Sequence, residues 1–290
     1  MYEIRNDQGM PLFVFSDMKF YYRKEDEVML KDFVELLGND GKQNIGQNYF
    51  QVDAKKLAVK VCDLFDDKFM DYLIIMLVGQ PDVPLHLNNW VDEKTKTIDF
   101  LNKLHVSLRI LGLSGSNTKS NEIFEIPTEF ISILRGNKWI VLKISKFYID
   151  IKGMLTLWEN KTSEKLFLTN CEIQINSSKI EKLKKKEKKK RNQRDQTSLE
   201  IYLTNTSIVD KMYPDSSQDR LENWKTLIEI FGFVNYKRMI NLIYIDNINE
   251  QEAKELKNTM DTIKFKKCIK LKYKYQGNKY VYTQNGPVMC

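Results

Sequence analysis

The amino-acid sequence predicts an α+β fold: a mixed α/β N-terminal domain, then a β-barrel or sandwich closed by a helix, then a basic tail. Two observations carry this prediction. Short β-type runs follow one another between residues 130 and 175, and a helix with one apolar face follows at Leu221–Phe231. The chain has 290 residues, of which 42% are hydrophobic, so it holds enough apolar material for more than one domain.

A polar stretch rich in Gly and Ser, Leu113–Ser120, is the expected boundary between the first two domains. The predicted domains are a mixed α/β domain over residues 1–115, a β-rich domain over 123–235, and a helix with a basic β-hairpin over 236–290.

In the first domain, β-favouring residues predict strands at Pro11–Phe15 and Lys19–Tyr22. Apolar residues at helical spacing predict a helix over Val28–Leu37, and Asp53 is placed to cap a helix that runs to about Phe65.

Two further segments complete the first domain. Phe69–Val78 is an apolar run with the length of a buried strand. Thr97–Ile110 fits a helix through Ile98, Leu101 and Leu104, although its last residues alternate like a strand, and the helix is the interpretation adopted.

Successive β-type runs separated by turns define the second domain, and no internal repeat is recognised in the sequence. The runs are Phe130–Leu134, Trp139–Ile149, Met154–Trp158, Lys165–Ile175 and Leu199–Leu203. The helix at Leu221–Phe231 then follows and places Trp224 on its apolar face, where we expect it to be part of the core.

Several segments of the second domain resemble those of a pleckstrin-homology (PH) domain. Lys138–Lys143 resembles the second strand of that family, Gly153–Trp158 the third, Leu166–Ile173 the fourth, and Asp215–Ile228 the approach and closing helix. The resemblance covers roughly residues 125–235 and implies a PH-like barrel. Because that fold hosts lipid binders and protein binders alike, it leaves the ligand open.

The resemblance also implies where a phosphoinositide would bind, since lipid-binding members use basic residues around the first hairpin. The residues in that region are Arg135, Lys138, Lys143 and Lys146. The first loop is short, so charges solvated at the strand edges are the favoured interpretation.

Positive charge is concentrated in one segment, residues 179–194, which holds ten Lys or Arg and two Glu. The whole chain has a net charge of +7, so the remainder is close to neutral and a broad nucleic-acid-coating role is disfavoured. The segment is interpreted as a solvated insertion, an anion-binding site for a membrane or nucleic acid, or a nuclear-import signal. Its candidate phosphate-binding residues are Lys182, Lys184, Lys185, Lys186, Lys188, Lys189, Lys190, Arg191 and Arg194.

The tail combines a helix at Glu250–Met260 with a hairpin that turns at Gln276–Asn278. One face of the hairpin carries lysines. Aromatic residues among lysines can stack nucleic-acid bases, which makes this a possible nucleic-acid site, but the same pattern is typical of an ordinary half-buried strand. The basic residues concerned are Lys266, Lys267, Lys270, Lys272 and Lys274.

No catalytic motif is present. Both histidines stand alone, with His86 in an expected loop, and an acidic cluster between Asp63 and Asp71 lacks a calcium-loop glycine. The four cysteines are far apart, so neither disulfides nor a zinc site are expected. The sequence therefore predicts no enzyme activity, no cofactor and no metal.

Taken together, these patterns predict a cytoplasmic or nuclear adaptor or scaffold without a transmembrane segment. It would bind a protein partner, an anionic membrane or phosphoinositide, or both, through the PH-like module and the Lys-rich insertion. The alternative is a nucleic-acid or chromosome-associated protein that uses the Lys-rich run and the tail hairpin.

Overall fold

Both helices and strands build the chain, which confirms the predicted α+β mixture. The computed structural model describes residues 2–5, 11–16, 19–28, 43–53, 57–60, 85–88, 94–104, 108–115, 123–136, 138–158, 163–176, 198–211, 220–234, 239–262, 270–283 and 286–289. The chain divides into two units, residues 1–120 with 137–140, and residues 121–136 with 141–290.

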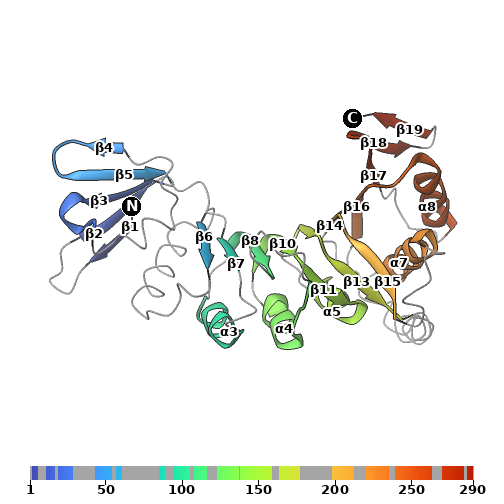
Figure 1. The fold of residues 1–290 in the computed structure, drawn as a ribbon, viewed down its shortest axis with the longest axis horizontal. Coiled ribbons are helices and arrows are strands. Elements are labelled where there is room, and N and C mark those ends of the chain that lie inside the picture. The colour runs from blue at the N-terminus through green and yellow to red at the C-terminus, as the bar shows by residue number, and fades with distance from the viewer. Residues whose placement is uncertain are drawn as a thin grey trace. The chain divides into compact units, whose positions relative to one another are not determined.

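The first unit contains an antiparallel sheet in the strand order β1-β2-β3-β5-β4 (Figure 1). The buried Tyr22 lies in this sheet, with its ring 5.5 Å from that of Phe50 on the next strand. The two strands predicted here are confirmed as β2 and β3. The bounds are β1 (Tyr2–Arg5), β2 (Pro11–Ser16), β3 (Lys19–Arg23), η1 (Lys24–Asp26), β4 (Gln43–Ile45) and β5 (Tyr49–Asp53).

The remainder of the first unit contains parallel strands. β7 (Leu85–Asn88) pairs with both β6 (Leu57–Lys60) and β8 (Leu108–Ser114), and α3 (Lys94–Lys103) lies between β7 and β8 in the chain. His86 therefore lies in a strand and not in the expected loop. The helix predicted from Asp53 is wrong over the described part, because β6 takes its backbone partners from β7.

The helix predicted over residues 97–110 is confirmed only as far as Lys103. From Leu108 the chain is a strand, because alternate residues Leu111 and Leu113 are buried and the backbone pairs with β7. The helix expected over Val28–Leu37 lies outside the described residues except for Val28, and so do the strand expected at 69–78 and the acidic cluster.

Two sheets of mainly parallel strands form the second unit, and the chain alternates between them as far as Asp246 (Figure 1). The larger sheet holds, in order, β10 (Trp139–Ser145), β12 (Lys165–Thr169), β14 (Ser198–Thr204), β16 (Met239–Asp246) and β17 (Lys270–Tyr275), all parallel. The smaller holds β9 (Phe124–Glu125), β11 (Phe147–Asp150), β13 (Glu172–Ile175) and β15 (Ser207–Asp210). The predicted tail hairpin is confirmed, as β18 (Asn278–Thr283) returns antiparallel to β17 and β19 (Gly286–Met289) follows it.

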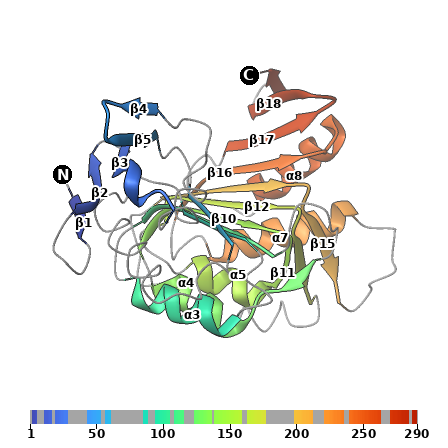
Figure 2. The ribbon, with the colours of Figure 1, turned by 60° about the vertical axis from the view of Figure 1, so that its left-hand side comes forward.

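Four described helices complete the second unit, and Figure 2 shows α4 and α5 on one side of the larger sheet. α5 contacts α4, β11 and β13, whereas α7 contacts α8 and β15. The ring of Trp158 lies 5.1 Å from that of Phe231, which joins α5 to α7. The bounds are α4 (Thr128–Gly136), α5 (Ile151–Trp158), α7 (Arg220–Val234) and α8 (Glu250–Thr262).

The two helices expected in this region are confirmed as α7 and α8. Trp224 is 3% exposed and belongs to the core, as predicted. At the start of α8, the Asn249 side chain accepts the backbone N–H of Glu252 at 2.8 Å, while the Glu252 carboxylate accepts the Asn249 N–H at 2.7 Å. This reciprocal capping box satisfies two backbone donors and fixes where α8 begins.

Phe130–Leu134 and Met154–Trp158 are helical, so the strands predicted for them are wrong. In α4 the buried residues Phe130, Ile131 and Leu134 follow helical spacing. In α5 the Asp150 side chain accepts the Gly153 N–H at 2.6 Å and so caps the helix. The β-favouring residues of these two segments are therefore buried on helices and not in strands.

The larger sheet also differs from the arrangement that the PH resemblance implies. The segment matched to the third strand, Gly153–Trp158, is part of α5. The segments matched to the second and fourth strands, in β10 and β12, are direct parallel neighbours. One chain turn therefore contributes one strand to each sheet, as in a solenoid.

A short pattern repeats with each turn, which corrects the expectation of a chain without repeats. Two inward apolar residues separated by one outward residue are followed, two positions later, by a corner residue with positive φ. The corner residues are Lys146 (φ 61°), Asn170 (51°), Asn205 (46°) and Asn247 (58°). The preceding apolar pairs are Leu142/Ile144, Leu166/Leu168, Ile201/Leu203 and Ile243/Ile245, all at most 3% exposed.

Side chains just after two of these corners bind back to the previous turn. The Cys171 thiol donates to the carbonyl of Ile144 at 3.5 Å, and the Thr206 hydroxyl donates to that of Leu168 at 3.0 Å. Ile144 and Leu168 are partners in the sheet register, so both bonds occupy the same place in successive turns. The turns are therefore equivalent structural units.

Candidate functional site

One row of side chains crosses the larger sheet of the second unit on the face opposite its buried residues. The register pairs Lys143 with Phe167, Phe167 with Tyr202, Tyr202 with Tyr244, and Tyr244 with Lys272. Each residue comes from a different strand, and all five are partly or fully exposed. We call these five residues the aromatic row.

The three rings of the aromatic row pack against one another. The rings of Phe167 and Tyr202 are stacked, with centroids 4.3 Å apart and an interplanar angle of 10°. The ring of Tyr244 lies 5.8 Å from that of Tyr202 at a tilt of 37°. Neighbouring parallel strands are about 4.8 Å apart, so rings at equivalent positions meet side by side. The row is a pre-formed ridge of apolar surface.

Lysines stand at both ends of the aromatic row. The Lys143 ammonium lies 5.8 Å from the centroid of the Phe167 ring, within range of a cation–π interaction. At the other end, Lys272 belongs to β17, whose outward residues also include Lys270 and Lys274. Within the described part of the chain, neither Lys143 nor Lys272 forms an ion pair.

A parallel row beside the rings is held by polar contacts. Lys165 forms an ion pair with Glu200 across the β12–β14 pair at 3.3 Å. Glu200 also accepts the Tyr202 hydroxyl at 2.8 Å. Partial burial, followed by this bond and the charge of Glu200, raises the pKa of Tyr202 to about 12. The Tyr202 ring is thus fixed both by stacking and by its hydroxyl.

The pKa of Tyr244 is also raised, first by partial burial and then by the charge of Asp246. Both phenols of the aromatic row therefore stay protonated at neutral pH. The ridge is uncharged between its two terminal lysines, which favours an occupant with an apolar centre.

The basic residues that the PH resemblance implied do not meet at one hairpin. Arg135 lies in the last turn of α4, and Lys138 immediately precedes β10. Lys146 is the corner residue at the far end of β10, and only Lys143 belongs to the aromatic row. The seven residues of β10 lie between Lys138 and Lys146, and each advances the chain by about 3.3 Å, so these two lysines are far apart.

Of the predicted tail residues, Lys270, Lys272 and Lys274 lie on β17. Lys266 and Lys267 lie outside the described residues, as do all nine candidate phosphate-binding residues between Lys182 and Arg194. Phe167, Tyr202 and Tyr244 were not recognised from the sequence. Aligning the repeated apolar pairs would have found them, since each occupies the position between the two apolar residues of its pair.

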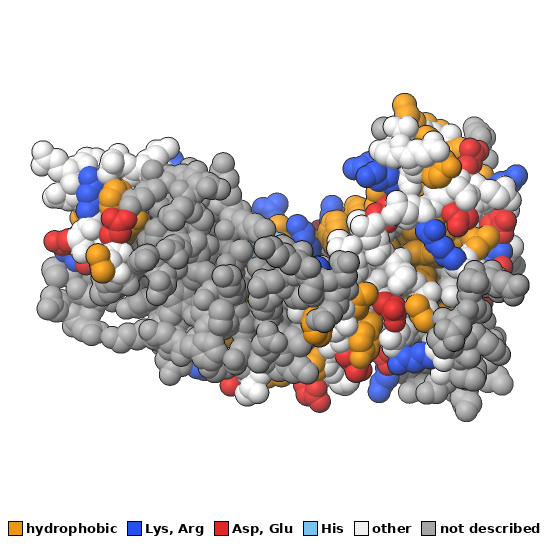
Figure 3. Space-filling model, in the orientation of Figure 1, with side chains coloured by type: hydrophobic (Ala, Val, Ile, Leu, Met, Phe, Trp, Pro, Cys, Tyr) orange, Lys and Arg blue, Asp and Glu red, His pale blue; other side chains and the backbone are white. Residues whose placement is uncertain are grey.

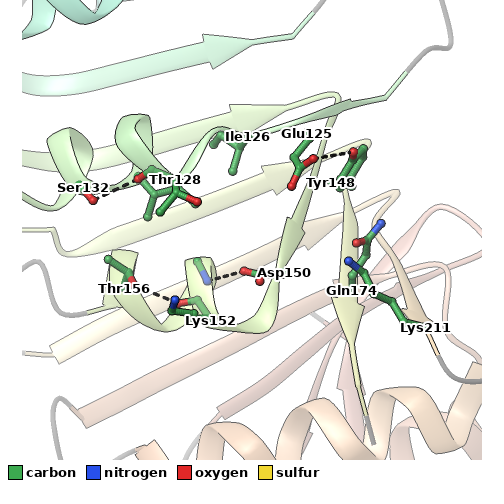
Figure 4. A pocket seen from close by; sticks show the side chains of 12 residues that line it. Glu125, Ile126, Thr128, Ser132, Tyr148, Asp150, Lys152, Thr156, Gln174 and Lys211 are labelled. Atoms are coloured by element: carbon green, nitrogen blue, oxygen red, sulfur yellow. Dashed lines mark hydrogen bonds between the residues drawn. The ribbon is translucent and has the colours of Figure 1, made fainter. Parts of the chain in front are cut away.

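A small pocket lies elsewhere in the second unit, beside the first turns of α4 and α5 (Figure 4). Its volume is about 120 Å³, enough for only a few water molecules. The buried Oε1 of Gln174, which lines the pocket, has no hydrogen-bond partner among the described residues. Other wall groups are hydrogen-bonded: the Tyr148 hydroxyl donates to Glu125 at 3.0 Å, and the Ser132 hydroxyl donates to the Thr128 carbonyl at 3.1 Å. These polar groups serve to fix the pocket walls.

Basic and hydrophobic side chains lie close together on part of the surface of the second unit. Figure 3 shows basic side chains next to hydrophobic ones at the level of β16–β18. Among the described residues, no group of three or more His, Cys, Asp or Glu side chains is placed to hold a metal ion.

Comparisons with known proteins give no relative for this chain. No family model, no curated protein and no solved structure matches it. None of the helices in the described part of the chain has the length and apolar character needed to cross a membrane.

Proposed function

We propose that the second unit is a solenoid of the leucine-rich-repeat type and that the chain is a non-enzymatic binding protein. Its repeated pattern resembles that repeat, L-x-x-L-x-L-x-x-N/C-x-L. In one turn the matching residues are Leu166, Leu168, Cys171 and Ile173. The strands begin at residues 139, 165, 198, 239 and 270, so the first turn has the usual length of about 20–29 residues and the next three are longer.

The observation that carries the proposal is the aromatic row on the strand face. Solenoids of this kind present an extended sheet surface on which partners bind, and side chains from successive turns supply the contacts. Large tyrosine and phenylalanine side chains dominate binding energy at interfaces because they bury much apolar area. The sheet positions one such side chain per strand on β12, β14 and β16.

In this proposal the strand face of the second unit, and not a PH-like module, is the binding surface of the predicted adaptor or scaffold. The expected membrane, phosphoinositide and nucleic-acid interactions of residues 179–194 involve a segment outside the described residues and stay predictions.

Photo-crosslinking from the strand face of the second unit, in cells that express the chain, tests the proposal. A photoreactive phenylalanine analogue replaces Tyr202 in one variant and Asn258, exposed on α8, in the control. We expect a crosslinked protein from position 202 and none from position 258. The partner, once purified, should bind the Tyr202→Ala/Tyr244→Ala variant about 30-fold more weakly than the intact chain. Equal crosslinking from both positions, or unchanged affinity, would contradict the proposal.

A further inference from the structure

We infer that the occupant of the aromatic row is an acidic segment of a protein partner, with an apolar centre flanked by carboxylates. The inference rests on the proposed function and names the chemistry of the partner. It follows from three properties of the row: its charge, the orientation of its rings and its length.

Charge selects a partner with carboxylates at both ends. Lys143 and Lys272 lie on β10 and β17, at opposite ends of the row, and neither forms an ion pair among the described residues. Two carboxylates lie near the rings. Glu200 is engaged by Lys165 and Tyr202. Asp246, beside Tyr244, accepts the backbone N–H of Asn205 at 2.7 Å and is paired with Lys274 in the sheet register. An incoming carboxylate therefore finds lysines at both ends and an uncharged centre.

Ring orientation disfavours single-stranded nucleic acid, the other class of anionic partner. Base binding of this kind needs open aromatic faces on which bases stack. One face of Phe167 is covered by Tyr202 at 4.3 Å, and the Lys143 ammonium lies over the ring at 5.8 Å. Tyr202 in turn lies between Phe167 and Tyr244. Phe167 and Tyr202 therefore present mainly their ring edges, which pack against apolar side chains better than against the face of a base.

Length sets the spacing between the two acidic groups. The row spans five adjacent strands, so four spacings of about 4.8 Å separate its terminal residues by about 19 Å. An extended peptide covers about 3.3 Å per residue, so the two carboxylates belong about six residues apart. The five residues between them would lie on Phe167, Tyr202 and Tyr244.

The test uses the full chain and a fluorescent synthetic peptide that carries one glutamate at each end of five apolar residues. Binding is followed by fluorescence anisotropy at about 0.1 M salt, where exposed charges act over about 10 Å. Two further probes are a peptide with lysines in place of the glutamates and a single-stranded oligothymidylate.

The variant Lys143→Glu/Lys272→Glu reverses the charge at both ends of the row. Lys152→Glu/Lys254→Glu is the matched control, because these exposed lysines lie on α5 and α8 and the change in net charge is the same. We expect binding of the acidic peptide to weaken about tenfold in the row variant and less than twofold in the control. The lysine peptide should bind the row variant better than the intact chain.

Two results would overturn the inference. One is equal loss of acidic-peptide binding in both variants, which would assign binding to general attraction by the basic segment. The other is tighter binding of the oligothymidylate that depends on Lys143 and Lys272. If position 202 still crosslinks to a partner in either case, the proposed function stands and only the acidic character of the partner is wrong.

Discussion

The corner residue Lys146 gives the sharpest test of the repeat that underlies this account. In three other turns the equivalent residue is asparagine, and all four have φ between 46° and 61°. This left-handed conformation costs an ordinary residue with a Cβ atom about 1–2 kcal/mol, whereas asparagine tolerates it better. Replacing Lys146 by asparagine should therefore raise the free energy of unfolding by about 0.5–1 kcal/mol.

Two further variants make the test specific. Asn170→Ala places an ordinary residue at φ 51° and should lower the free energy of unfolding by about 1 kcal/mol. Lys254→Asn makes the same exchange as Lys146→Asn, but at an exposed position inside α8, where asparagine is the poorer helix former. That control should lose about 0.5 kcal/mol.

Urea unfolding followed by tryptophan fluorescence measures all three, because Trp158 and Trp224 are buried in the second unit. The expected difference would be absent if Lys146→Asn destabilised the chain as much as Lys254→Asn does. Equal behaviour would mean that the corners are not equivalent positions of one repeat.

Three further predictions concern single side chains. The pKa of Tyr202 is raised to about 12 from its ordinary value of 10.0, so the folded chain keeps a proton that the unfolded chain loses and stability falls between about pH 10 and 12. Tyr202→Phe should reduce the loss of stability between pH 9 and 11, measured by urea midpoints, and an unchanged loss would contradict this. Burial raises the pKa of the Cys171 thiol to about 11, so a variant with Cys171 as its single cysteine should react with a thiol reagent only when unfolded. In the first unit, a Cβ atom at Gly112 would lie 2.1 Å from Nδ1 of His86 on the neighbouring strand, so Gly112→Ala should destabilise by about 1–3 kcal/mol, and His86→Ala in the same chain should recover part of that loss.

Elements with a strong local pattern were predicted well from the sequence. The helix α8 has its three apolar residues, Ala253, Leu256 and Met260, on one face, and all three are buried. The β17–β18 hairpin alternates strictly and carries a Gly at its turn, where φ is +85°. Such signals lie within a few residues of one another, so tertiary contacts are not needed to interpret them.

The parallel sheets could not be predicted in the same way, because their pairing joins residues that are far apart in the chain. A helix such as α5 contains Leu155 and Leu157, which favour a strand by alternation, and its helical state depends on burial against β11 and β13. The unequal return segments also hide the repeat. The lysines of β17 were recognised as a candidate site, whereas the aromatic row required the register that brings five strands together.

Hydrogen–deuterium exchange can show whether the strand face of the second unit binds the partner. The full chain is compared with and without the acidic peptide described above. With the peptide bound, we expect slower exchange in the strand segments β10, β12, β14, β16 and β17, and unchanged exchange in α7 and α8. Slower exchange confined to α7 and α8, or to residues 179–194, would contradict it.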